Sequence, residues 1–400
     1  MVELVTDQMT GGKIMHPLDR FGFEISDEQK QIYDAMLRFG LEHLQSGAQE
    51  RDRSHSFPSA QAKALADMGG FAMKAGSEDD GPALDNLSYL LTIEALSRYD
   101  ASLGVVAVAG NLAASILSKA ANKSQRESYL RPLARGEKGA MSFALTEPHC
   151  GSDAAAMKTT ARKSGKGWVL SGSKQWITGA TDAELFLVFA KTPEEGDGGY
   201  SAFVVERGQA GFSLGRAEDK MGLRSSGTAQ LFFESCELPD EALVGAVGQG
   251  FRYALSGIAA SRLAIAAQSI GIAERALELG LAYARERQAF GQAVLQFQNS
   301  QFVFADCRCA LDQAWLLMLR GAKLLDKGVE DIRAEASMAK LAASEMCGRV
   351  VDQMVQMHGG NGYSQDFEIE RLYRDARVMR IFEGTSEVKR EVIAREILKA

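Results

Sequence analysis

The spacing of hydrophobic and polar residues divides the chain into three regions. Residues 26–135 follow a helical pattern, and residues 89–99 and 101–121 are rich enough in leucine, alanine and valine to be helices buried on several sides. Residues 140–244 change to short β-rich runs at 158–162, 168–170, 185–190, 202–206 and 231–233. After residue 250 the pattern is helical again, in long segments at 251–287, 300–327 and 332–357.

This order predicts an α+β protein of several modules. We expect an N-terminal α-helical domain at residues 1–138, a middle antiparallel β domain at 139–246 and a C-terminal four-helix bundle at 247–400. The absence of an internal period and of alternating strands and helices excludes repeat solenoids and doubly wound sheets. The bundle seam is predicted from a spacing of three, four or seven residues between Phe304, Cys307, Leu311, Ala314, Met318 and Leu325.

Local signals mark where some elements begin and turn. Ser26 with Gln29, and Ser124 with Glu127, have the spacing of capping boxes at helix starts. Glycine-rich turns at 164–167 and 194–199 predict hairpins between the β-rich runs.

Composition and charge narrow the class of protein. The chain has 400 residues, 46% of them hydrophobic, and a net charge of −7, which disfavours binding to nucleic acid. The five cysteines form no CxxC pair and the histidines no HExxH, so we expect no metal site and a reducing, cytoplasmic location. The opening residues do not resemble a targeting peptide. The longest apolar run, residues 103–109, is too short to predict a membrane span.

Five segments are the strongest candidates for chemistry. They are ALTEPHCGSD (144–153), KQWITGA (174–180), ERQAFG (286–291), QMHGGNGY (356–363) and IFEGTSEV (381–388). Taken singly, each has an ordinary structural explanation. The first is a turn, Trp176 and Phe290 are core residues, Arg287 is solvated, the glycines cap a helix and Glu383 lies in an exposed turn.

Taken together, these segments resemble the acyl-CoA dehydrogenase family along nearly the whole chain. The resemblance implies FAD as cofactor and an acyl-CoA substrate that is desaturated between its α and β carbons. It also implies an electron-transfer flavoprotein as partner and a homotetramer built as a dimer of dimers. FAD contacts are implied for Phe143, Leu145, Thr146, Gly151, Ser152, Trp176, Ile177, Thr178, Arg287, Phe290, Gln298, Gln356, Gly359, Gly360, Thr385 and Glu387.

The resemblance assigns the catalytic base to Glu383. Neighbouring Ile381 and Phe382 place its carboxylate against apolar surface, and desolvation would raise its pKa and make it a better base toward carbon. Some relatives carry the base on the long helix, at the position of Ser261, which cannot serve here. Substrate contacts are implied for Ser152, Ser261, Arg262, Gly384 and Arg395.

Some questions stay open at this level. An acyl-CoA oxidase using oxygen, or a DNA-associated member of the same fold without dehydrogenase activity, is an alternative. The resemblance places Val105 and Ala109 near the pocket floor, where their small size leaves room, and we expect short to medium straight chains as substrates. His149, Cys150 and Phe382 depart from the family pattern, so the flavin surroundings and substrate preference are in doubt.

Overall fold

The computed structural model describes residues 16–399 except 166 and 194–198. Its N-terminal helices run α1 to α7: Asp27–Phe39, Ala48–Ser54, Ser59–Asp67, Asn86–Tyr99, Ala101–Ala120, Lys123–Gln125 and Arg131–Ala134. Helices α4 and α5 confirm the two predicted buried helices. The Ser26–Gln29 capping box is present, but the second prediction is wrong. Asn122 and Gln125 form that box instead, because the chain enters the helix two residues earlier.

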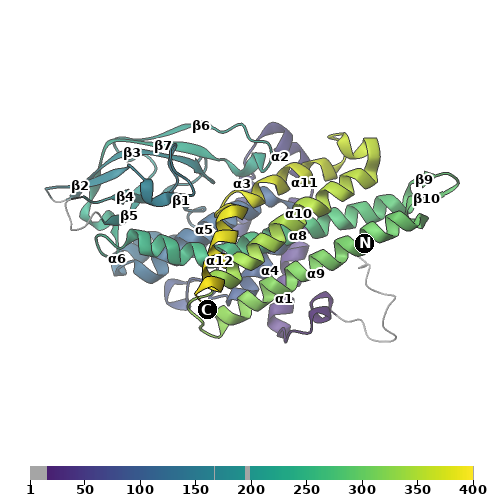
Figure 1. Cartoon of the computed structure of the whole chain (residues 1–400). Helices are drawn as coiled ribbons and strands as arrows, with labels where there is room; N and C mark the ends of the chain where they lie inside the picture. Colours follow the sequence, from purple (N-terminus) through teal and green to yellow (C-terminus); the bar gives the residue numbers. More distant parts are fainter. Residues whose placement is uncertain (1–15, 166, 194–198, 400) are drawn as a thin grey trace.

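The middle of the chain folds into one eight-stranded sheet, drawn as the upper layer in Figure 1. Its strands β1 to β8 are Ser142–Ala144, Thr160–Ser164, Gly167–Ile177, Leu185–Lys191, Tyr200–Glu206, Phe212–Ala217, Ala229–Pro239 and Leu243–Val244. Four of the five predicted runs lie within strands and the run at 158–162 overlaps the start of β2, whereas β1, β6 and β8 were not predicted. The antiparallel expectation holds for most pairs, but β4 pairs in parallel with β1 and with one residue of β2.

Two predicted hairpins have their strands in place. Strand β2 pairs antiparallel with β3, and β4 pairs antiparallel with β5. Residue 166 in the first predicted turn and residues 194–198 in the second lie outside the described residues.

The C-terminal part consists of long helices packed against one another. They are α8 to α12, at Gly250–Glu286, Gln298–Asp326, Arg333–His358, Glu368–Ala376 and Ser386–Leu398, and a short hairpin of β9 (Gln288–Ala289) and β10 (Gln292–Ala293) follows α8. Helices α8, α9 and α10 pack together and α12 packs on α10 (Figure 1). The predicted seam of α9 is confirmed at Cys307, Leu311, Ala314 and Met318, which are fully or almost fully buried, whereas Phe304 and Leu325 at its ends are half-buried.

Helix α8 joins the three regions, because it packs on α4 and α5 as well as on α9 and α10. Within the described residues, α5 and α8 are each long and apolar enough to cross a bilayer by length and composition. Most of each apolar stretch is buried inside the protein, as is usual for helices in a hydrophobic core. One apolar core runs through α4, α5, α8, α9 and α10, and on α8 it begins at Leu263, directly after Ser261 and Arg262.

Candidate functional site

The first two sequence segments meet at one end of the sheet. The Gln175 amide donates to the Thr146 carbonyl (2.9 Å), and the Ser142 hydroxyl donates to the Thr178 carbonyl (2.8 Å). These bonds connect the loop at 145–152 to the end of β3. We call residues 143–152 and 176–178 the strand-end shelf, and it contains all eight cofactor residues predicted in these two segments.

The shelf carries a large aromatic face that the protein leaves open. Trp176 is 54% exposed and has a left-handed backbone (φ 61°), so its interpretation as a core residue is wrong. The side chains of Leu145 and Ile177 are buried in the core, which leaves only their backbone groups available. At Gly151 a side chain would meet nothing nearer than 3.9 Å, so the backbone there can be approached closely.

A buried ion pair holds the shelf in place. The Glu147 carboxylate accepts bonds from Lys174 Nζ (2.7 Å) and from the amides of Lys158 (2.6 Å) and Thr159 (3.0 Å). Burial raises the pKa of Glu147, but Lys174 and the amide donors outweigh it and hold that pKa below its usual value. The side chains of Glu147 and Lys174 are both almost fully buried.

The same loop gathers three side chains that could ligate a metal. Ligand atoms of Glu147, His149 and Cys150 lie within 4.8 Å of one another. The Glu147 oxygens already accept bonds from an ammonium and two amides, so a cation there would compete with Lys174. The prediction that the protein has no metal site stays a prediction.

Glu383 lies where the C-terminal segment crosses the first half of α8. Its backbone has φ 53°, a conformation that is uncommon for residues other than glycine and is often found at functional sites. Among the described residues, its Oε2 and the hydroxyl oxygen of neighbouring Ser261 are both buried and neither makes a well-formed hydrogen bond, although Ser261 lies close enough to lower the pKa of Glu383. The exposed-turn interpretation of Glu383 is therefore wrong for its carboxyl group.

Three cationic side chains surround this carboxyl group, and we call Arg262, Lys340 and Lys389 the cation cluster. Lys340 and Lys389 are completely buried. Lys340 Nζ donates to the Gly384 carbonyl (3.0 Å). A Cβ built on Gly384 would lie 2.5 Å from Lys389 Nζ, so this amine packs directly on the residue after Glu383.

The cation cluster and the burial of the carboxyl group shift the pKa of Glu383 in opposite directions. Burial raises the pKa of Glu383, whereas Arg262, Lys389 and Lys340 lower it. Burial also lowers the pKa of Lys340 to about 8 and that of Lys389 to about 7. The net result is a desolvated carboxylate with a raised pKa, which is the property a base needs for removing a proton from carbon.

Replacing Lys389 by methionine is expected to raise the pKa of Glu383, because it removes one of the three opposing positive charges. Glu383 is the base that the sequence implies, and it must be ionised to accept a proton. The low-pH limb of the profile of kcat/KM against pH should therefore move to higher pH. At the low-pH end we expect kcat/KM to fall roughly threefold to tenfold below the native value. Lys399→Met, at the exposed end of the same helix, is the control, and a profile unchanged by Lys389→Met would contradict the coupling.

Six other predicted cofactor residues lie at the opposite end of α8 from Ser261 and Glu383. Arg287 and Phe290 follow α8, Gln298 begins α9, and Gln356, Gly359 and Gly360 lie at the end of α10. The end of α8 and the end of α10 are joined by stacking of Tyr283 on His358 (4.3 Å between ring centres). All six predicted cofactor residues in these two places are exposed. Ser261 and Arg287 are 26 residues apart on α8, about 40 Å at roughly 1.5 Å per residue.

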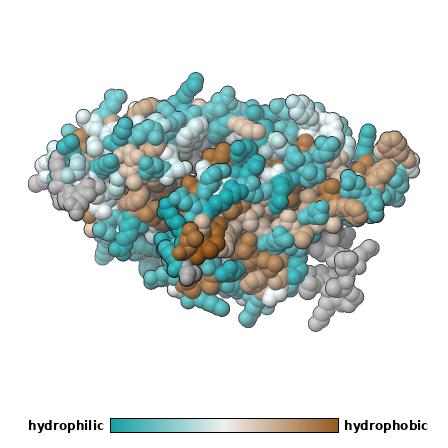
Figure 2. Space-filling view, viewed as in Figure 1, coloured by the Kyte–Doolittle hydropathy of each residue, from teal (hydrophilic) through white to brown (hydrophobic). Residues whose placement is uncertain are grey.

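Phe290 illustrates how open this far end is. Its side chain is 97% exposed, so a core role is wrong, and Figure 2 shows hydrophobic surface at the β9–β10 tip. Thr385 and Glu387 instead lie next to Glu383, where Thr385 caps the first turn of α12. Ser152 is exposed on the shelf, and Arg395 is exposed farther along α12 and paired with Glu391.

Three residues at the site were not predicted: Lys340, Lys389 and Tyr89. The charge of Glu383 acts on the Tyr89 hydroxyl, whose pKa is raised chiefly by burial. A signal existed for Lys340, since it shares the spacing of the buried residues Ala336, Ala343 and Cys347 along α10. The signal for Lys389 was weaker, because on α12 it shares the spacing of buried positions only with Ser386, three residues before it.

Comparison with protein-family models matches three consecutive parts of the chain. Residues 26–137 match the acyl-CoA dehydrogenase N-terminal domain, 142–236 the middle domain and 248–398 the C-terminal domain. These matches cover most of the chain.

Individual proteins are similar over nearly their full length. The human mitochondrial short-chain specific acyl-CoA dehydrogenase is 41% identical over 379 residues, covering 94% of this chain and 92% of that protein. An acryloyl-CoA reductase (NADH) of Anaerotignum propionicum is 37% identical over 96% of this chain and 97% of its own. Among solved structures, butyryl-CoA dehydrogenase of Megasphaera elsdenii has a TM-score of 0.90 at 34% identity, covering 94% and 99% of the two chains. A glutaryl-CoA dehydrogenase of Mycobacterium smegmatis in complex with FADH2 has a TM-score of 0.90 at 25% identity, covering 96% and 97%.

Proposed function

The chain belongs to the acyl-CoA dehydrogenase family, and we propose that it desaturates a short to medium acyl-CoA at the α and β carbons with Glu383 as base. One observation carries this proposal. The Glu383 carboxyl group is desolvated, its Oε2 makes no well-formed hydrogen bond among the described residues, and it lies beside Ser261 and the cation cluster. A carboxylate in that state is matched to a weakly acidic carbon proton.

The protein's own groups divide the chemistry in a simple way. The thioester is proposed to bind between the strand-end shelf and Glu383, with its carbonyl oxygen on the Glu383 amide, which would stabilise enolate-like charge. The Glu383 carboxylate takes the α-proton and becomes neutral. Substrate contacts are proposed for Ser152, Ser261, Arg262, Gly384 and Arg395, which the sequence also implied.

The shelf fits FAD as the cofactor. The exposed face of Trp176 can cover a flat ring, and the open backbone around Gly151 leaves room for close polar contacts. When bound, the flavin would accept the hydride that leaves the β-carbon, so that one proton and one hydride are removed as the double bond forms. Family structures with this cofactor bound support the proposal.

A second copy of the chain is proposed to complete the cofactor site. Arg287 and Ser261 are separated by about 40 Å of rigid helix, so Arg287 cannot reach the site of its own chain. Exposed Arg287, Phe290 and Gln356 would instead contact FAD of a neighbouring subunit in a homotetramer. Light scattering of the holoenzyme should give four times the chain mass, and a monomer that binds FAD tightly would refute this arrangement.

An experiment can identify the electron acceptor and the direction of the reaction, desaturation or reduction. An electron-transfer flavoprotein is the proposed acceptor, whereas an NADH-linked reductase among the relatives and the oxidase alternative would use other partners. Butanoyl-CoA should bleach the oxidised flavin without oxygen and yield the trans-2-enoyl thioester, and reoxidation should be faster with the flavoprotein than with air. Rapid reoxidation by air at every turnover would make it an oxidase, and salt-sensitive binding of duplex DNA would revive the third alternative.

A further inference from the structure

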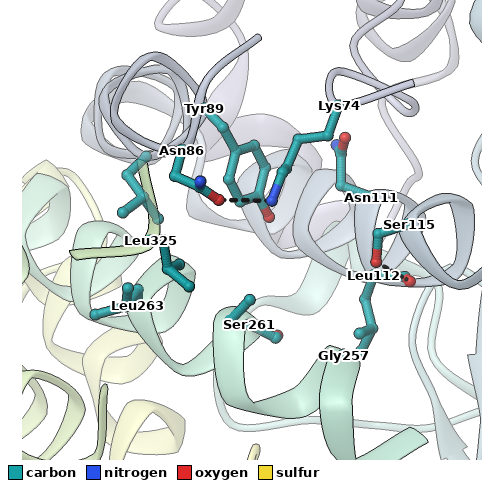
Figure 3. A pocket seen from close by; sticks show the side chains of 12 residues that line it. Lys74, Asn86, Tyr89, Asn111, Leu112, Ser115, Gly257, Ser261, Leu263 and Leu325 are labelled. Carbon is teal, nitrogen blue, oxygen red and sulfur yellow. Dashed lines mark hydrogen bonds between the residues drawn. The ribbon is translucent and has the colours of Figure 1, made fainter. Parts of the chain in front are cut away.

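A narrow cavity extends from the catalytic centre toward the start of α4, between α4, α5 and α8 (Figure 3). Ser261 and Tyr89 line it, and both lie within the electrostatic reach of Glu383. Lys74, Asn86 and Leu325 line it as well. The cavity volume is about 30 Å³, room for a small group such as one or two waters.

Lys74 places a positive charge in this cavity. Its Nζ donates to Asn86 Oδ1 (2.6 Å), as the dashed line in Figure 3 shows. Within the described part of the chain Lys74 forms no salt bridge with a carboxylate, although the nearby Asp326 charge raises its pKa. The nearby Asp326 carboxylate instead accepts bonds from the Asn86 amide groups (2.7 and 2.8 Å). Burial lowers the pKa of Lys74, and exposed Lys119 lowers it further.

Two other polar side chains of the cavity, Asn111 and Ser115, already use their hydrogen-bonding groups within the protein. Asn111 accepts from the Met73 amide and donates to the Gly70 and Ala107 carbonyls. The Ser115 hydroxyl donates to the Leu112 carbonyl. An ammonium has three donors, and Lys74 uses one of them on Asn86. Ser261, beside Glu383, also has an unpartnered hydroxyl group, so among the described wall residues Lys74 is the charged one with donors left for a ligand.

We propose that Lys74 is a specificity residue, which selects acyl-CoA substrates whose chain ends in an oxygen-bearing polar group, a hydroxyl or a carboxylate. This inference rests on the proposed function and names its substrate class. A cation in a partly dehydrated cavity binds such an oxygen strongly, whereas a terminal methyl group there would leave the ammonium donors without acceptors. The small volume suits a compact end group.

The test compares matched substrates on the holoenzyme. Straight-chain acyl-CoAs from butanoyl to octanoyl are assayed beside their ω-hydroxy and ω-carboxy counterparts, with the native protein, Lys74→Met and Lys119→Met. Lys119 is exposed on α5 and does not line the cavity, so its variant controls for lost surface charge. In Lys74→Met the ratio of kcat/KM for polar over plain substrates should fall about tenfold to a hundredfold, and in Lys119→Met it should stay as in the native protein.

Other outcomes would overturn the inference in distinguishable ways. An unchanged ratio in Lys74→Met would show that the chain end does not reach Lys74. An equal rise in KM for all thioesters, together with weaker inhibition by free CoA, would assign Lys74 to the CoA moiety. If no acyl-CoA bleached the flavin of the native protein, the proposed function itself would fail.

Discussion

Replacing Glu383 by glutamine is expected to lower kcat for acyl-CoA desaturation about a thousandfold to ten-thousandfold, the usual contribution of a positioned base. Glutamine has nearly the same shape but cannot accept the α-proton. The flavin spectrum and the affinity for a thioester should change little, because the shelf and the rest of the substrate site are retained. Stopped-flow bleaching without oxygen measures the chemical step directly.

A matched control separates the loss of the base from the loss of a negative charge. Glu330→Gln removes a carboxylate from the exposed connection before α10 and should retain native kinetics. If Glu383→Gln bleached the flavin at the native rate, another group would be the base. The cation cluster would then have to serve a different purpose.

Replacing Gly384 by alanine should be the second most damaging change. Gly384 has φ 89°, which disfavours any side chain, and its new Cβ would lie 2.5 Å from Nζ and 2.7 Å from Cε of buried Lys389. The strain should lower the unfolding free energy by about 1–2 kcal/mol, and displacement of the adjacent base should lower kcat on the order of a hundredfold. Thermal unfolding and single-turnover kinetics give the two quantities.

Gly328→Ala is the control for backbone strain alone. Gly328 has a similar φ of 78°, but its added Cβ would meet nothing within 4 Å. It should lose stability without losing activity. Adding Lys389→Ala to Gly384→Ala should restore part of kcat by relieving the overlap, and equal activity losses in the two glycine variants would argue against a role for the Lys389 contact.

Long periodic segments were predicted well because their signal is repeated many times. The expected helices at 251–287 and 332–357 agree with α8 and α10 within one or two residues at each end. Strand β1 has only three residues, and β6 is half exposed with little alternation, so neither carries a clear pattern. The capping box at Asn122 was misplaced because two overlapping pairs shared the same spacing.

The site was predicted where the chemistry is local in sequence and missed where it depends on packing. Glu383, the proposed base, was predicted from its motif and its apolar neighbours, and the structure shows that its carboxyl group is buried. Lys340 and Lys389 come from two helices that meet only in the folded chain, and sequence alone favours placing lysines at the surface. The cavity beside Lys74 likewise forms only where three helices pack together, so no local sequence pattern could have predicted it.

The central claim is that Glu383 removes the α-proton of a thioester bound over the flavin. The most direct measurement is anaerobic stopped-flow reduction of the holoenzyme by butanoyl-CoA and by its α-deuterated form. We predict that α-deuteration slows bleaching severalfold in the native protein and that Glu383→Gln shows almost no bleaching with either substrate. Equal rates for the two substrates, with native-like bleaching in Glu383→Gln, would contradict the account.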